Sequence, residues 1–160
     1  MANLFVLTFK DEGGADRTLQ KLASLQKEQL IVVDDAAVAV HPKNGKVRIR
    51  QARSLVGTGA LGGAFWGMLF GLIFFIPFAG LAIGAATGAL MGKLSDYGID
   101  DKFIKQVSEK VTPGTSALFF LSHDAQKEKV IDALKPYGGE LLQSSLSPAQ
   151  ETELKEALAA

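Results

Sequence analysis

The chain has 160 residues, 48% of them hydrophobic, which is enough for one domain with a sizeable core and an insertion but short for two full domains. Its 17 basic and 17 acidic residues balance, so net charge gives no argument for a nucleic-acid partner. Cysteine is absent, which excludes disulfides, thiolate metal sites and thiol catalysis.

The first third of the chain predicts a strand, a helix and a hairpin of two strands. Leucines at helical spacing follow a double glycine, and β-branched residues return after residue 30. An Asn44-Gly45 turn then leads into Val47 and Ile49, which alternate with basic residues as in a half-buried strand. The expected elements are a strand over 3–9, a helix over 15–29, a strand over 30–40, a turn over 41–45 and a strand that includes 47–49.

The next segment, residues 54–92, contains no Asp, Glu, Lys or Arg. Its glycines form two series with a spacing of four, which places each series on one side of a helix and allows a second backbone to approach closely. Pro77 lies between the series and interrupts the helical hydrogen bonds. We therefore predict an apolar helical hairpin, a glycine zipper, over 54–93. The packing residues are Gly59, Gly63, Gly67, Gly71, Gly80, Gly84, Gly88 and Gly92.

The length of this hairpin suits a membrane. A helix over 55–76 would be about 33 Å long, against a hydrocarbon core of about 30 Å, whereas one over 79–93 would be only about 22 Å. The basic residues at its two ends place both ends on the cytoplasmic side; they are Arg48, Arg50, Arg53 and Lys93. The tip carries no polar residue that could meet water on the far side of the bilayer. A re-entrant hairpin is therefore an alternative to a full crossing.

The last part of the chain predicts a second half of the same domain. Phe103 and Val107 lie on one face of an expected helix, and Pro113-Gly114 ends it. The expected elements are a helix over 100–111, a strand over 117–121, a helix over 124–134, a strand over 140–146 and a terminal helix that begins at Ser147-Pro148.

Strand, helix and strand thus recur on both sides of the hairpin. This half-repeat favours an α+β fold, with a ferredoxin-like antiparallel sheet that has its helices on one face and is interrupted by the apolar hairpin. We divide the chain into 1–53, the first half of the α+β domain; 54–93, the hairpin; and 94–160, the second half with its C-terminal helix.

Several longer motifs run through almost the whole chain. They are Val6–Phe9, Asp34–Val38, the Gly45-Lys46-Val47 hairpin, Ile76–Gly80, Leu94–Phe103, Pro113–Phe119 and Ala133–Gly139. Together they resemble a bacterial membrane-associated family, domain-of-unknown-function family 1269. The resemblance implies a membrane protein without a known activity, and it supplies no catalytic residues.

No catalytic, cofactor or metal site is predicted. His41 and His123 are far apart in sequence and suit solvated loops. Asp34 and Asp35 are neighbours on a strand and should point to opposite faces, so they should not share a proton or a metal. The pair Asp100-Asp101 suits the N-terminus of a helix.

Residues Gly57 to Gly62 have the spacing of a dinucleotide loop but open an apolar helix, which argues against nucleotide binding. The leading hypothesis is a non-enzymatic membrane protein with both termini cytoplasmic, which assembles with copies of itself through the hairpins as a scaffold, in membrane remodelling or in a stress role. Its partners are itself and membrane lipid, with no nucleic acid and no cofactor. The alternative is a soluble homo-oligomeric regulatory or small-molecule-binding module with the hairpins buried in the assembly.

Overall fold

The computed structural model describes residues 3–51, 69–71, 73, 101–123, 126–144 and 148–159, and the statements below concern these residues. Its elements in chain order are β1 (Asn3–Phe9), α1 (Gly14–Lys27), β2 (Val32–His41), β3 (Arg48–Gln51), α5 (Asp101–Lys110), β4 (Thr115–His123), α6 (Lys127–Leu134), the 3-10 helix η3 (Lys135–Tyr137), β5 (Glu140–Ser144) and α7 (Pro148–Ala159).

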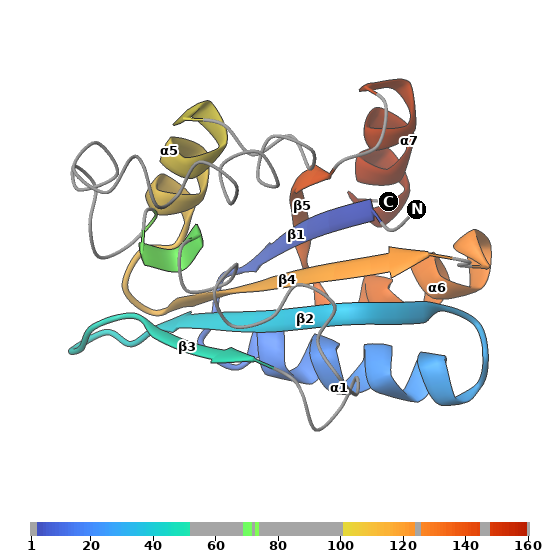
Figure 1. Ribbon diagram of the computed structural model, residues 1–160, viewed down its shortest axis with the longest axis horizontal. Helices are drawn as coiled ribbons and strands as arrows, with labels where there is room; N and C mark the ends of the chain where they lie inside the picture. Colours follow the sequence, from blue (N-terminus) through green and yellow to red (C-terminus); the bar gives the residue numbers. More distant parts are fainter. Residues whose placement is uncertain are drawn as a thin grey trace, which may run out of the picture.

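The five strands form one antiparallel sheet in the order β3-β2-β4-β1-β5 (Figure 1). The central strand β4 comes after the apolar segment in sequence, yet it pairs along its length with β1 on one side and β2 on the other. The two halves of the chain therefore share one sheet. The prediction of an α+β fold with an antiparallel sheet is confirmed.

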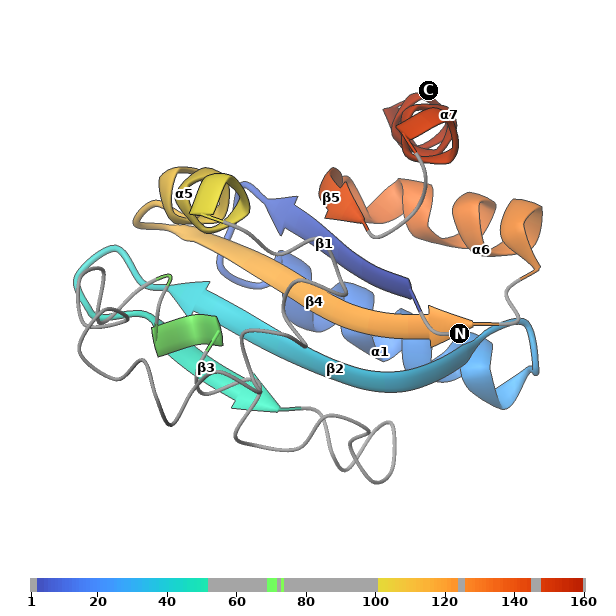
Figure 2. The same cartoon turned by 45° about the horizontal axis from the view of Figure 1, so that its top comes forward.

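Both faces of this sheet are covered. Helices α1 and α6 lie on one face, here the α1 face, where their side chains pack against Val38, Leu118 and Phe120. The opposite face, here the α5 face, is covered by α5 and by a helical turn that contains residues 69–71 and 73 (Figures 1 and 2). The prediction that helices lie on one face only is wrong. The central strands carry apolar side chains on both sides, so both sides need cover.

The start of α1 is held by a strand far away in sequence. The helix has no side-chain cap of its own; instead the backbone N–H of Ala15 donates to Ser116 Oγ on β4 at 3.1 Å, and Ser116 Oγ donates to the carbonyl of Asp11 at 2.8 Å. Gly14 lies so close to Phe9 that an added Cβ would stand 2.6 Å from the Phe9 Cβ. The double glycine therefore allows α1 to begin directly against β1.

The expected helical faces in the C-terminal half largely agree with the structure. Phe103 and Val107 of α5 are fully buried, as predicted. Leu154 and Leu158 of α7 both pack against the core of the α1 face. Some bounds differ: β4 spans 115–123 where the sequence predicted 117–121, and α6 begins at residue 127, not 124.

Candidate functional site

The described part of the apolar segment lies in the core of the α5 face. Leu69, Phe70 and Ile73 are buried, with exposed fractions of 0%, 1% and 5%. The Phe70 ring meets the Phe119 ring of β4 edge-on, with centroids 4.8 Å apart and an interplanar angle of 88°. At least this turn of the predicted first arm therefore packs on the sheet of its own chain.

Most of the predicted glycine zipper lies outside the described residues. This applies to Gly59, Gly63, Gly67, Gly80, Gly84, Gly88 and Gly92, and also to Pro77, Arg53 and Lys93. The remaining zipper glycine, Gly71, is half-buried, and no described atom lies within 4 Å of where its Cβ would be. Among the described helices, none is long and apolar enough to cross a membrane.

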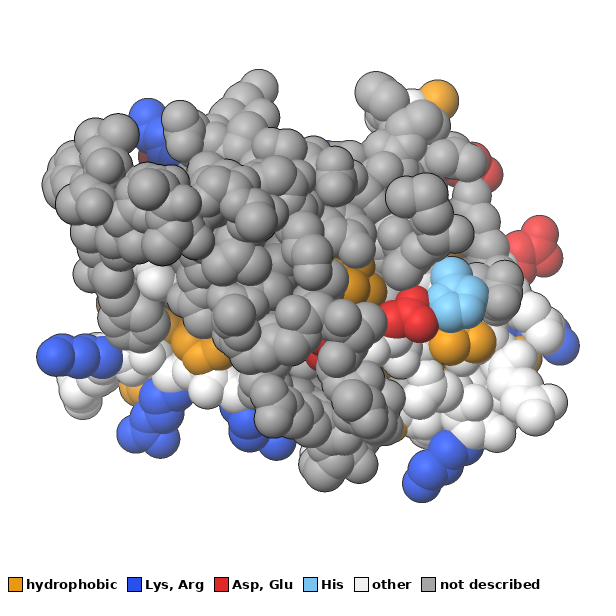
Figure 3. All heavy atoms as spheres, viewed as in Figure 1, with side chains coloured by type: hydrophobic (Ala, Val, Ile, Leu, Met, Phe, Trp, Pro, Cys, Tyr) orange, Lys and Arg blue, Asp and Glu red, His pale blue; other side chains and the backbone are white. Residues whose placement is uncertain are grey.

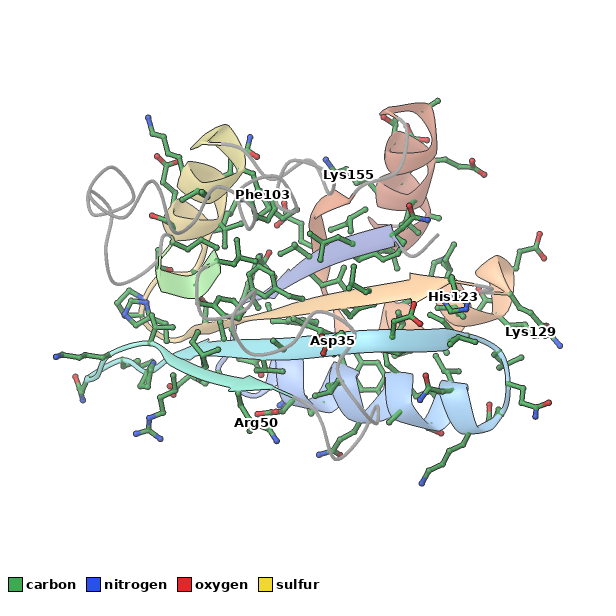
Figure 4. All side chains as sticks on the ribbon, in the orientation of Figure 1. Asp35, Arg50, Phe103, His123, Lys129 and Lys155 are labelled. Atoms are coloured by element: carbon green, nitrogen blue, oxygen red, sulfur yellow. The ribbon has the colours of Figure 1, made fainter. Side chains whose placement is uncertain are left out.

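The hairpin between β2 and β3 presents a basic edge. Lys43, Lys46, Arg48 and Arg50 are exposed, and among the coloured side chains in Figure 3 the basic ones gather along the lower edge of the molecule. Arg50 points away from the sheet and pairs with Asp16 of α1 (Figure 4). The intervening Val47 and Ile49 pack against the same core as Phe70.

Asp34 and His123 form a side-chain hydrogen bond that sequence reasoning missed. Asp34 Oδ2 lies 2.7 Å from His123 Nδ1, and both side chains are partly exposed. A β-bulge between Val33 and Asp35 makes Asp34 an extra residue in β2. The prediction that Asp34 and Asp35 point to opposite faces does not hold, because this bulge interrupts the alternation of the strand. No sequence signal marks the bulge.

Asp35 is 1% exposed, and its Oδ1 accepts a hydrogen bond from the backbone N–H of Ala36 at 2.9 Å. In Figure 4, Asp35 and His123 come from the neighbouring strands β2 and β4. Within the described parts of the chain, no three His, Asp or Glu side chains are placed to hold one metal ion. Asp34, Asp35 and His123 thus add side-chain hydrogen bonds at this end of the sheet.

His41 has a structural contact. Its Nδ1 lies 2.9 Å from the carbonyl oxygen of Val111, and a carbonyl only accepts, so Nδ1 carries the proton. This bond links the end of β2 to the segment between α5 and β4. The expectation of a solvated loop histidine is therefore wrong for His41, which is the last residue of β2 and only partly exposed.

The fold and these contacts define an α+β protein in which part of a long apolar segment covers one face of an antiparallel sheet. The profile of the family described as "Protein of unknown function (DUF1269)" matches residues 60–159 of the chain. The match covers more than half of the sequence, so the chain belongs to this family. No curated protein and no solved structure matches it.

Proposed function

We propose that the chain is a non-enzymatic membrane-associated protein that assembles with copies of itself through residues 54–92. The observation that carries this proposal is the absence of charge across these residues together with two four-glycine series. Glycine inside a water-exposed helix costs about 1 kcal/mol relative to Ala, so eight of them would destabilise two solvated helices unless close packing or lipid compensates.

The charges that flank this segment support membrane association with both ends of the segment on the cytoplasmic side. No Asp or Glu occurs between Asp35 and Asp96, whereas basic residues lie at both ends of the apolar segment. Lys43, Lys46 and Arg48 of the β2–β3 hairpin are exposed, whereas the alternate residues Val47 and Ile49 pack against the core of the α5 face. Lys and Arg near a membrane segment favour the anionic cytoplasmic leaflet, so both termini would lie in the cytoplasm.

The burial of the apolar turn favours a re-entrant hairpin over a full crossing. If residues 55–76 crossed the bilayer as one helix, Phe70 could not also pack against Phe119 in a water-facing domain. A shallow insertion of residues beyond this turn is compatible with that contact. The packed turn thus fixes one end of the inserted segment to the sheet.

For the domain, we propose a ferredoxin-like arrangement. The order β2-β4-β1-β5, together with α1 between β1 and β2 and α6 between β4 and β5, supports it. Both helices lie on the same face, as two strand-helix-strand halves require. In this arrangement the apolar segment and α5 form the insertion that covers the other face.

Self-assembly is tested by Gly63→Leu and Gly84→Leu, with Ala64→Leu and Ala85→Leu as matched controls. Each control residue is turned by about 100° from the glycine before it, so it adds bulk away from the glycine series. We expect both glycine variants to have a smaller mass than the wild type in light scattering in detergent, because leucine separates the helices. An unchanged mass in both would contradict the proposal.

The same burial favours a second candidate, a soluble assembly in which the hairpins are covered by protein. Leu69, Phe70 and Ile73 show that this sheet can bury part of the segment without lipid. This candidate predicts a discrete oligomer extracted in buffer without detergent, whereas the membrane proposal predicts that extraction needs detergent.

A further inference from the structure

The β2–β3 hairpin carries three basic residues that no acidic residue of the described chain neutralises. Lys43, Lys46 and Arg48 are exposed, and none of them has an ion-pair partner among the described residues. Residues 36–95 contain no Asp or Glu, so the hairpin has no acid of its own. Arg50, the next basic residue, is already paired with α1. We call Lys43, Lys46 and Arg48 the hairpin cations.

The hairpin cations belong to one edge of the sheet. Among the described strands, β3 pairs with β2 alone. Arg48 lies opposite Val40, which packs on the α1 face, whereas Ile49 packs against the core of the α5 face. The stem of Lys43 passes over Gly114, where an added Cβ would be 3.3 Å from the Lys43 Cγ. Because long side chains at a sheet edge can reach past either face, a flat surface laid against this edge can contact all three cations.

The apolar segment leaves the sheet from this same edge. Strand β3 ends at Gln51, and the segment without charge begins at Ser54. Three residues of extended chain span at most about 11 Å, and the Debye length at physiological ionic strength is about 8 Å. The turn that contains Phe70 lies at the hairpin end of the sheet (Figures 1 and 2), where Val47 packs against the same core. If the apolar segment enters a bilayer, the β3 edge is therefore held near its surface.

We infer that the hairpin cations bind the phosphate groups of anionic phospholipids and that the β3 edge of the domain lies on the bilayer surface. The inference rests on the proposed membrane association and adds the lipid class and the contact surface. Ammonium and guanidinium groups form strong, charge-assisted hydrogen bonds with phosphate oxygens. Each cation near an anionic leaflet raises the partition coefficient about fivefold, so three raise it about a hundredfold.

The test measures how close the hairpin tip comes to lipid headgroups. Because the chain has no cysteine, Asn44→Cys attaches a bimane fluorophore at the tip alone. The labelled full-length protein is reconstituted into vesicles of phosphatidylcholine, or of phosphatidylcholine mixed with phosphatidylglycerol, each with a trace of lipid that carries a nitroxide on its headgroup. We expect the nitroxide to quench bimane at least about fivefold more strongly in the anionic vesicles, and we expect high salt to remove the difference.

Charge reversal tests whether the hairpin cations cause this quenching. The variant combines Lys43→Glu, Lys46→Glu and Arg48→Glu, and its quenching in anionic vesicles should fall to the level in neutral vesicles. A matched control changes net charge by the same amount at exposed lysines outside the hairpin and should behave as the wild type; it combines Lys27→Glu, Lys129→Glu and Lys135→Glu. Circular dichroism checks folding. The lipid and salt series need only the labelled wild-type chain, so the test stays decisive if the hairpin variant does not fold.

Flotation of the same samples separates this inference from the proposed function. Flotation with both kinds of vesicle, and strong quenching in the anionic ones alone, supports the inference. Flotation with both kinds and equal quenching in them overturns the inference but leaves membrane association in place; the cations would then serve an acidic protein or a nucleic acid. Flotation with neither kind overturns both proposals.

Discussion

Replacement of Phe70 by Ala tests whether the apolar segment is part of the domain core. Phe70 is 1% exposed and packs edge-on against Phe119. Truncation of a buried phenylalanine costs about 3–5 kcal/mol, of which the aromatic pair itself contributes about 0.5–1.5 kcal/mol. If the free energy of unfolding falls by about 2 kcal/mol per molar urea, a loss of about 4 kcal/mol in that free energy lowers the urea midpoint of unfolding by about 2 M.

The assay is urea unfolding followed by far-ultraviolet circular dichroism of the full-length protein. Phe119→Ala is the matched control. Phe119 is buried on the central strand, so its replacement should destabilise the domain wherever the apolar segment lies. A double-mutant cycle with Phe70→Leu and Phe119→Leu should give a coupling free energy of about 0.5–1.5 kcal/mol. If Phe70→Ala leaves the midpoint unchanged while Phe119→Ala lowers it, the packing of this turn on the sheet is refuted.

Two further predictions concern the beginning of α1. Gly14→Ala should lower the free energy of unfolding, measured by thermal unfolding, by about 1–3 kcal/mol, because the added Cβ would be 2.6 Å from the Phe9 Cβ. Gly45→Ala is the control: its added Cβ would meet only Pro42, at 3.6 Å, so the free energy of unfolding should change by less than about 0.5 kcal/mol in the same assay. The hydrogen bond from Arg17 lowers the pKa of Asp11 below its ordinary value of 3.8. The pair therefore stabilises the fold above pH 3.8, and this stabilisation is lost as the pH falls through the lowered pKa of Asp11. Asp11→Asn should therefore be less stable than the wild type near neutral pH and approach it in acid unfolding; a stability difference that grows on acidification would contradict this assignment.

Local patterns predicted most of the individual elements. Leucines at helical spacing indicated α1, and the apolar runs around Phe5 and Phe119 indicated strands. The half-repeat also indicated that both ends of the chain build one antiparallel sheet. The individual helices and strands depend on contacts between near neighbours in sequence, where periodicity decides which side chains share a face. The shared sheet joins strands that are distant in sequence, and only the recurrence of strand, helix and strand indicated it.

What the sequence did not predict depends on contacts between distant residues. The α5 face is covered by Phe70, a residue that its sequence neighbours assign to a membrane hairpin. The N-terminus of α1 takes its hydrogen-bond acceptor from Ser116, 101 positions from Ala15. The pair of Asp34 and His123 requires a bulge, and a bulge is one extra residue with no signature of its own.

Flotation of the full-length protein with phospholipid vesicles tests the membrane proposal most directly. Cells that express the protein are lysed without detergent, and their membranes are washed with alkaline carbonate. The washed membranes are then floated in a density gradient, and each fraction is analysed for the protein. Our account predicts that the chain rises with the lipid after the wash and leaves it only in detergent. Recovery of the chain at the bottom of the gradient, as a discrete particle that is stable in buffer, would contradict it.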